Sequence, residues 1–290
     1  MTKTKEIYKT LQTGLPLVLL PMLAYIWGRP QPGWVLMWLL AFSLFAACKI
    51  LTGRQIPEEI ESGDKWTYFL GWPGMDPKRF FARRPQGEFS MELGRIALRN
   101  VLLGAGLMLG VAPRFFARPL LAGWIGMTGL IFMLHFGLFH LLALHLQRKG
   151  FGADPIMNRP HLGNSLANFW GQRWNRAFQC LTWTYLFQPL RKRMPAVGAL
   201  WICFLVSGLI HELVITVPAR GGYGGPTAYF LLQALGLVLE RKFRNRVRPW
   251  LMRVWTLSIV LLPAGWLFPA QFVLRIIVPM FQAWGIFPPQ

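Results

Sequence analysis

The sequence predicts an all-α polytopic membrane protein, and three observations support this class. Hydrophobic residues make up 54% of the 290-residue chain and charged residues only 14%, whereas soluble domains carry about 25% charged residues. Apolar runs approaching the about 20 residues that cross a bilayer recur along the chain. Basic residues gather in alternate connections between those runs. We expect one membrane-embedded domain spanning residues 1–290, with about eight transmembrane helices plus interfacial or re-entrant helices.

The predicted spans follow one another from the N-terminus onward. The first apolar run could pass for a signal peptide, but no small-x-small cleavage pattern follows it, so we expect a retained helix. The sixth run is the weakest because Gly224, Gly225 and Pro226 shorten it. The eight runs are residues 11–27, 33–51, 96–112, 119–146, 195–217, 226–240, 250–268 and 272–287.

The distribution of the 31 Lys and Arg residues predicts the orientation. Most of them lie in the N-terminal tail or in the connections at about 52–95, 147–194 and 241–249, which we therefore place on the cytoplasmic side. Both termini should then be cytoplasmic. The opposite connections hold Arg29, Arg114, Arg118 and Arg220. We see no added sorting motif, which favours a bacterial inner membrane over an organelle.

The formal net charge of +20 raises the question of a nucleic-acid partner. A nucleic-acid footprint needs basic residues clustered on one soluble face, and here they punctuate apolar runs. We therefore expect no nucleic acid and attribute most of the charge to topology and to anionic membrane lipids, especially along residues 241–248. Cys48, Cys180 and Cys203 are widely separated, so neither a disulfide framework nor a metal site is predicted.

One amphipathic segment, residues 165–190, stands out between the apolar runs. Asn164 or Ser165 can cap a helix there. An apolar stripe then recurs at helical spacing, with polar residues on the other side. Either the segment is an interfacial anchor, where Trp and snorkelling Arg are ordinary, or it lines the entrance for an anionic amphipathic substrate. The stripe is Leu166, Trp170, Trp174, Phe178, Leu181 and Tyr185, and the polar side is Gln172, Arg173, Arg176 and Gln179.

His211 is the second feature that indicates chemistry. It lies about 16 residues into the run 195–217, roughly 24 Å along that helix at 1.5 Å per residue. Ser207 stands four residues earlier on the same face, Gly208 permits a close approach, and Glu212 follows. Such a pair inside a membrane marks either a functional polar path or a core histidine satisfied by a backbone or hydroxyl partner. As a base, a neutral imidazole could remove a hydroxyl proton, with Asn175 or Ser207 orienting it.

The other histidines predict no site. His135, His140 and His145 are spaced by five, which puts successive rings about 140° apart on a helix, unlike two metal ligands on one face. We expect packing or interfacial roles for them, and no metal.

Four pieces of sequence resemble the wax synthase branch of the membrane-bound O-acyltransferase superfamily. They are YFLGWPGMDP at 68–77, NRPHLGNSL at 158–166, FWGQRWN at 169–175 and SGLIHEL at 207–213. The resemblance implies a helical bundle perforated by an internal tunnel. It also implies acyl transfer from acyl-CoA to a hydroxyl, with His211 as the base and Asn175 near the cytoplasmic opening. Trp170, Arg173 and Trp174 would shape donor entry, Ser207 would lie at the site, and Glu212 would tune His211 or support its helix.

The leading hypothesis is therefore an acyl-CoA-dependent O-acyltransferase that esterifies a lipophilic alcohol or related hydroxyl compound without a resident cofactor. Alternatives are an acyltransferase for a sugar or polymer hydroxyl, an acetyltransferase for a small natural product, and a catalytically silent scaffold. A polytopic transporter or proton relay would instead predict paired half-helices or a repeat, and we see neither. The oligomeric state is not predicted.

Overall fold

The computed structural model describes residues 2–82, 90–243 and 246–289, and helices account for nearly all of its regular structure. No strand occurs in these ranges. Residues 83–89 of the first predicted cytoplasmic connection and 244–245 of the third lie outside the described part. The α-helices are α1 (Thr2–Gly28), α2 (Gly33–Gly53), α3 (Ser62–Gly71), α4 (Pro77–Phe81), α5 (Met91–Ala105), α6 (Pro119–Ile131), α7 (Phe139–Arg148), α8 (Leu166–Asn168), α9 (Arg176–Thr182), α10 (Gln188–Arg191), α11 (Ala196–His211), α12 (Val217–Ala219), α13 (Gly225–Phe243), α14 (Pro249–Leu261), α15 (Ala264–Leu267), α16 (Ala270–Phe272) and α17 (Val278–Ala283).

Several consecutive helices run on through π-helical or 3₁₀ turns and form longer continuous rods. The π-helical segments include Phe169–Arg173, Trp183–Phe187 and Glu212–Thr216. The first two lie within the amphipathic segment 165–190, and the third begins directly after His211. A π-bulge adds a residue to a turn and re-aims the side chains beside it.

Five helices in the described part of the chain are long and apolar enough to cross a membrane. The chain is thus a polytopic helical protein, with fewer such helices than the eight predicted. The first and eighth predicted spans correspond to shorter apolar helices, and α13 is too polar to qualify because of its charged C-terminal end. The five are Gly33–Gly53, Met91–Phe115, Pro119–Arg148, Ala196–Ala219 and Pro249–Leu267.

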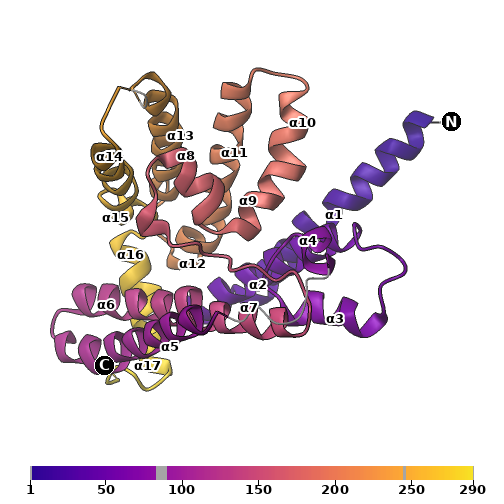
Figure 1. Cartoon of the computed structure of the whole chain (residues 1–290). Helices are drawn as coiled ribbons and strands as arrows, with labels where there is room; N and C mark the ends of the chain where they lie inside the picture. The colour runs from indigo at the N-terminus through magenta and orange to yellow at the C-terminus, as the bar shows by residue number, and fades with distance from the viewer. Residues whose placement is uncertain (1, 83–89, 244–245, 290) are drawn as a thin grey trace.

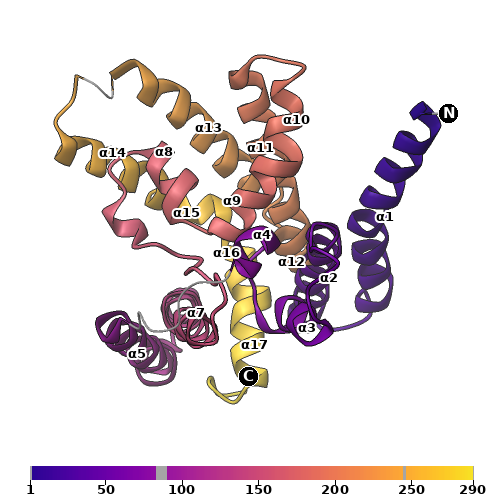
Figure 2. The same ribbon diagram turned by 45° about the vertical axis from the view of Figure 1, so that its right-hand side comes forward.

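The helices form two groups joined through α12, α16 and the chain between α7 and α8 (Figure 1). One group contains α8 to α11 with α13 to α15, and the other contains α5, α6 and α7 with α17. Helices α2, α3 and α4 lie at a third side, and α1 extends away from the rest while contacting α2 (Figure 2). The groups meet at a core in which Phe281, Ile276 and Met280 are fully buried.

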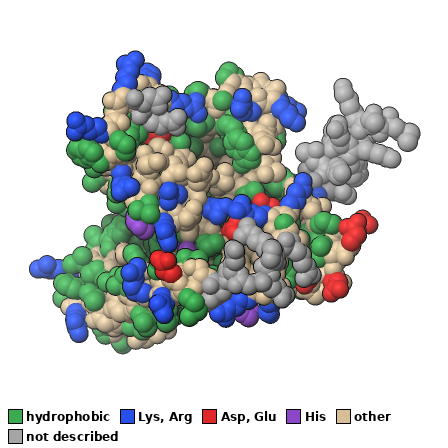
Figure 3. Space-filling view, in the orientation of Figure 1, with side chains coloured by type: hydrophobic (Ala, Val, Ile, Leu, Met, Phe, Trp, Pro, Cys, Tyr) green, Lys and Arg blue, Asp and Glu red, His purple; other side chains and the backbone are tan. Residues whose placement is uncertain are grey.

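Many large hydrophobic side chains are exposed, as on a surface that faces lipid, and on the face in Figure 3 they gather most densely over the α5 and α6 end. Large hydrophobic side chains such as Leu262, Leu102 and Phe42 are more than 60% exposed. In water such a surface would be an association liability, whereas lipid tails solvate it at no cost.

The first long connection, between α2 and α5, packs against the second, between α7 and α11. Tyr68, Trp72 and Phe80 are buried against Phe151 and Ala177 of the second connection. The two connections therefore share one core, in which buried aromatic rings supply most of the contact area.

A lysine fixes this core to the membrane helices. Lys49 on α2 is 3% exposed, and its Nζ donates to the backbone oxygens of Tyr68 at 2.8 Å and Gly74 at 2.7 Å. The same ammonium lies 3.5 Å from the centre of the Tyr68 ring. The turn between α3 and α4 is thus held against the C-terminal end of α2.

Candidate active site

His211 is the last residue of α11, at the depth that the sequence predicts. Its Nδ1 lies 2.7 Å from the backbone oxygen of Ser207. A carbonyl oxygen only accepts, so in the neutral ring Nδ1 carries the proton and Nε2 keeps its lone pair. No described residue donates a hydrogen bond to Nε2, and the side chain is only partly buried. The ring therefore has one nitrogen fixed and one nitrogen available as a base.

Ser207 orients His211 through its backbone, and not through its side chain. Its hydroxyl donates back to Cys203 at 2.9 Å, the usual contact for serine inside a helix. Gly208 permits the close approach that its position suggested, because a Cβ there would stand 2.8 Å from the Cα of Thr227 on α13. Helices α11 and α13 are thus in contact one turn before the histidine.

Aromatic rings join His211 to the amphipathic segment. The imidazole lies 4.5 Å from the ring of Phe230 on α13, measured between centroids. Phe230 in turn lies 5.8 Å from Trp170, and Trp170 also packs edge-on against Phe204 of α11. Two motifs separated in sequence therefore meet around one phenylalanine, and Trp170 contacts the same ring as the histidine.

The residues that bring the two motifs together lie on α13. This helix was predicted as a span, but no role was predicted for its polar residues. Gln233 is fully buried; its amide oxygen accepts from the indole of Trp170 at 3.3 Å and its amide nitrogen donates to Ile259 at 2.8 Å. Glu240, 2% exposed, accepts the backbone amides of Leu166 and Ala167 at 2.6 and 3.3 Å. Gln233 and Glu240 were visible as polar residues in the run 226–240, seven apart and hence on one helix face.

Glu212 serves α13 as well. Its carboxylate accepts from the hydroxyl of Thr216 at 2.6 Å and from the amide and hydroxyl of Thr227 at 3.1 and 3.0 Å. Three donors satisfy a charge that would otherwise be costly in the membrane. No side-chain hydrogen bond or ion pair in the described part of the chain joins Glu212 to His211. Of its two expected roles, the structure therefore favours helix support.

The amphipathic segment is not one continuous helix, and that prediction is wrong. Ser165 caps its start, accepting from Asn168 at 2.9 Å, but the helix ends at Arg173 and a new one begins at Arg176. Between them Trp174 is extended and Asn175 has a φ of 42°. The stripe therefore divides at Trp174, because a left-handed residue reverses the chain direction.

Asn175 forms this break and caps the following helix. Its Oδ1 accepts from the amide of Phe178 at 3.5 Å, and its backbone amide points to the sulfur of Met157 at 3.2 Å. Asparagine tolerates a left-handed conformation better than most residues and also caps well. The side-chain Nδ2 has no hydrogen-bond partner among the described residues. No contact joins Asn175 to His211.

Arg173 and Trp174 support the same turn. The Arg173 Nε donates to Asn168, and its Nη1 donates to the backbone oxygens of Asn158 and Arg159 at 3.3 and 3.2 Å. Trp174 stacks on Phe169 with ring centroids 5.6 Å apart. Much of the guanidinium is thus engaged by the chain's own carbonyls.

Among the other histidines, His135 and His140 pack inside the fold, whereas His145 and His161 are exposed. The Nδ1 of His140 lies 3.1 Å from the backbone oxygen of His135, and His135 packs edge-on against Phe139. Within the described ranges, no group of three His, Cys, Asp or Glu side chains is arranged to hold a metal ion.

This arrangement defines a polytopic membrane protein with a polar centre built on one histidine. Residues 153–232 match the model of the membrane bound O-acyl transferase family. That segment contains both the broken helix and His211, and the match confirms the family resemblance that the motifs indicate.

Three curated relatives are similar to part of this chain. A long-chain-alcohol O-fatty-acyltransferase of Simmondsia chinensis is 30% identical over 145 residues, 44% of this chain and 41% of the relative. A probable long-chain-alcohol O-fatty-acyltransferase 6 of Arabidopsis thaliana is 29% identical over 137 residues, 42% and 40% of the two chains. An acyl-CoA–sterol O-acyltransferase 1 of Arabidopsis thaliana is 27% identical over 133 residues, 41% and 39%. The matched segment thus spans about two fifths of each relative's length.

Proposed function

We propose that the chain is an O-acyltransferase that moves an acyl group from acyl-CoA to the hydroxyl of a lipophilic alcohol. The observation that carries the proposal is the available Nε2 of His211, inside a segment that matches an acyltransferase family. The relatives' names specify long-chain alcohols and a sterol as acceptors. For this chain we propose the same class of acceptor, a lipophilic alcohol, without naming one compound.

The reaction needs one base and no covalent enzyme intermediate. The Nε2 of His211 takes the hydroxyl proton as the alcohol oxygen attacks the thioester carbonyl. The carbon–sulfur bond then breaks, the ester is released, and the CoA thiolate recovers a proton from the imidazolium. Nδ1 stays bound to the Ser207 carbonyl, which keeps the ring oriented and stabilises the imidazolium that forms.

The remaining predicted residues take supporting parts in this proposal. Asn175 uses Oδ1 for the helix cap, so its Nδ2 is the donor that can steady charge on the thioester oxygen. Trp170 and Trp174 form apolar walls for the donor, Arg173 fixes the turn that carries them, and Glu212 fixes α11 to α13.

The wider organisation is also part of the proposal. We propose a single membrane-embedded domain over residues 1–290, with an internal tunnel that brings donor and acceptor to His211 and with cytoplasmic termini. Acyl-CoA is a substrate, and no resident cofactor is needed. A bacterial inner membrane stays a prediction from the sequence; the relatives named above are plant proteins.

Purified protein in detergent, labelled long-chain acyl-CoA and a panel of alcohols and sterols would test the proposal. We expect ester formation by the wild type and its loss in His211→Ala and Asn175→Ala, with the folded state checked by circular dichroism. Robust ester formation by folded His211→Ala would contradict the assigned base. No thioester consumption with any acceptor would contradict acyl transfer.

A further inference from the structure

A cavity lies between the two cytoplasmic connections, away from the contacts described around His211. Its volume is about 340 Å³. One wall comes from the end of α2 and the α3–α4 turn with α4, and the other from the helix 176–191. Both walls belong to connections that the charge distribution places in the cytoplasm. The proposed acyl-transfer chemistry has so far assigned no role to either wall.

The lining of the cavity combines apolar and polar side chains. Met75, Pro77 and Leu181 supply apolar surface, and hydroxyl and amide groups with two cations supply the polar part. Lys78 and Arg79 are exposed there, whereas Tyr185 is half-buried and accepts from Gln55 at 2.6 Å. The side chains that matter most are Asp76, Lys78, Arg79, Thr184, Tyr185 and Gln188.

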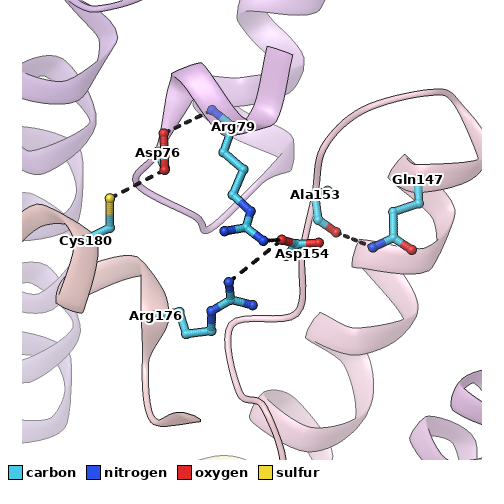
Figure 4. A network of polar contacts seen from close by, with 7 residues as sticks. All are labelled: Asp76, Arg79, Gln147, Ala153, Asp154, Arg176 and Cys180. Atoms are coloured by element: carbon cyan, nitrogen blue, oxygen red, sulfur yellow. Dashed lines mark hydrogen bonds and ion pairs between the residues drawn. The ribbon is translucent and has the colours of Figure 1, made fainter. Parts of the chain in front are cut away.

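An internal network holds these walls in place (Figure 4). Asp154, on the chain between α7 and α8, pairs with Arg79 of α4 and with Arg176 of α9 at 3.8 Å. Asp76 accepts from the backbone amide of Arg79 at 3.0 Å and from the thiol of Cys180 at 3.5 Å. Both oxygens of the Asp76 carboxylate thus have donors, which reduces the repulsion that an anionic ligand would meet.

We propose that this cavity binds the nucleotide end of the acyl-CoA donor, an inference that rests on the proposed function. Its phosphates would pair with Lys78 and the exposed side of Arg79, since guanidinium and ammonium groups are the usual phosphate partners. Its ribose and base would bond to Thr184, Gln188 and Gln55. The volume lies at the low end of ligand pockets, about 300–1,000 Å³, which suits a nucleotide and excludes the whole thioester.

Position separates this ligand from other anions. The acyl chain of the donor must enter the membrane while its nucleotide stays in water. The cavity lies between connections that the charge distribution predicts to be cytoplasmic, where acyl-CoA is found. A phospholipid head group offers a similar phosphate but only a small polar remainder, so it would leave the amide and hydroxyl wall unused. Binding of anionic lipid in place of nucleotide is therefore an outcome that overturns the proposal.

The first test measures binding of adenosine 3′,5′-bisphosphate, which lacks both thioester and acyl chain, by calorimetry on the whole protein in detergent. We expect saturable binding, weakened about tenfold by Lys78→Glu and unchanged by Lys192→Glu, an exposed lysine outside the cavity. Thr184→Trp, which fills the cavity, should abolish binding. Equal binding by wild type, Lys78→Glu and Thr184→Trp would overturn the site, as would displacement of the nucleotide by phosphatidylglycerol micelles.

The second test uses Cys180 as a reporter on the cavity wall. Burial and the neighbouring Asp76 raise the pKa of this thiol, so its alkylation is slow but measurable by peptide mass spectrometry. The bisphosphate should slow alkylation of Cys180 and leave the rest of the labelling pattern unchanged. Undiminished alkylation at saturating nucleotide would contradict the proposal.

These tests can fail separately from the proposed function. If wild type forms ester and the acyl-CoA KM of Lys78→Glu equals that of Lys192→Glu, the cavity assignment is wrong and acyl transfer stands. If the nucleotide binds with the expected pattern but no ester forms with any acceptor, the reaction is wrong and the cavity stands. A KM raised about tenfold at unchanged kcat in Lys78→Glu supports both.

Discussion

The surroundings of His211 and of Asn175 differ in what their polar atoms do. His211 sits at the end of a long apolar helix, with one ring nitrogen bound to a carbonyl and the other available. Asn175 sits at a break between two short helical segments, with a φ of 42° and its side-chain oxygen capping the next helix. Sequence resemblance gives both residues the same rank as catalytic groups.

The difference shows that the fold depends on the Asn175 side chain more than on the His211 side chain. Removing the His211 side chain leaves the backbone hydrogen bonds of α11 in place. A loss of activity in such a variant would therefore have a chemical cause. Removing Asn175 alters the turn itself. Activity lost on substituting Asn175 therefore means little unless the fold is measured beside it.

The largest expected effect is that of His211→Ala. We predict that ester formation falls about 10²- to 10⁴-fold, the usual contribution of a general base, while the melting temperature stays near that of the wild type. His161→Ala, at an exposed loop position, is the matched control and should retain full activity. If His211→Ala is inactive only because it unfolds, the claim that the fold does not depend on His211 is wrong.

Asn175→Asp sharpens the comparison from the other side. Aspartate tolerates the left-handed conformation and caps helices as well as asparagine, but it lacks the Nδ2 donor. We predict an unchanged melting temperature and a kcat lowered about 10²-fold, as for loss of one charge-stabilising donor. Asn175→Gly should behave alike, and Asn164→Asp is the control. If Asn175→Asp keeps the wild-type kcat, Asn175 has a structural role and does not stabilise charge in the reaction.

Gln233→Leu tests the link between the two regions. It removes the acceptor for Trp170 and the donor to Ile259 at a fully buried site, which should cost about 1–3 kcal/mol of stability. Because Trp170 would also lose its fixed position, we expect an acyl-CoA KM raised by severalfold. Chemical unfolding and steady-state kinetics measure both, with exposed Gln271→Leu as control. An effect on stability alone would mean that α13 does not connect the regions functionally.

Arg173→Lys should have the smallest effect. Lysine keeps the charge but cannot reproduce the bonds to Asn168, Asn158 and Arg159 together. We predict a stability loss of about 1 kcal/mol and a KM changed less than threefold, with exposed Arg191→Lys as control. A large rise in KM with intact stability would instead favour direct contact between Arg173 and the donor.

Much of the helical architecture and the position of His211 could be predicted from sequence. Apolar runs and helix caps depend on local composition, so the membrane class, the cap at Ser165 and the place of His211 along its helix could be predicted. The break at Asn175 did not, because the stripe through Trp170, Trp174 and Phe178 is compatible with a continuous helix. Backbone contacts with residues 156–158 hold the break: Asn158 donates to Arg173 at 2.8 Å, and Arg176 donates to Ile156 at 3.0 Å.

The supporting residues were harder to predict for the same reason. In the sequence, Gln233 and Glu240 are polar residues that interrupt an apolar run. Their partners, Trp170 and the start of α8, lie more than 60 residues away in the sequence. Lys49 read as the end of a span, although it is buried against the α3–α4 turn. Polar residues inside apolar runs thus predicted that partners exist, and only the fold identified those partners.

The pH dependence of kcat/KM for ester formation tests the central claim most directly. If neutral His211 is the base, wild-type kcat/KM should fall about tenfold per pH unit below the pKa of that base and level off above it, because only the unprotonated ring accepts the proton. The residual activity of His211→Ala should show no such acidic limb. An acidic limb that persists unchanged in folded His211→Ala would contradict the account.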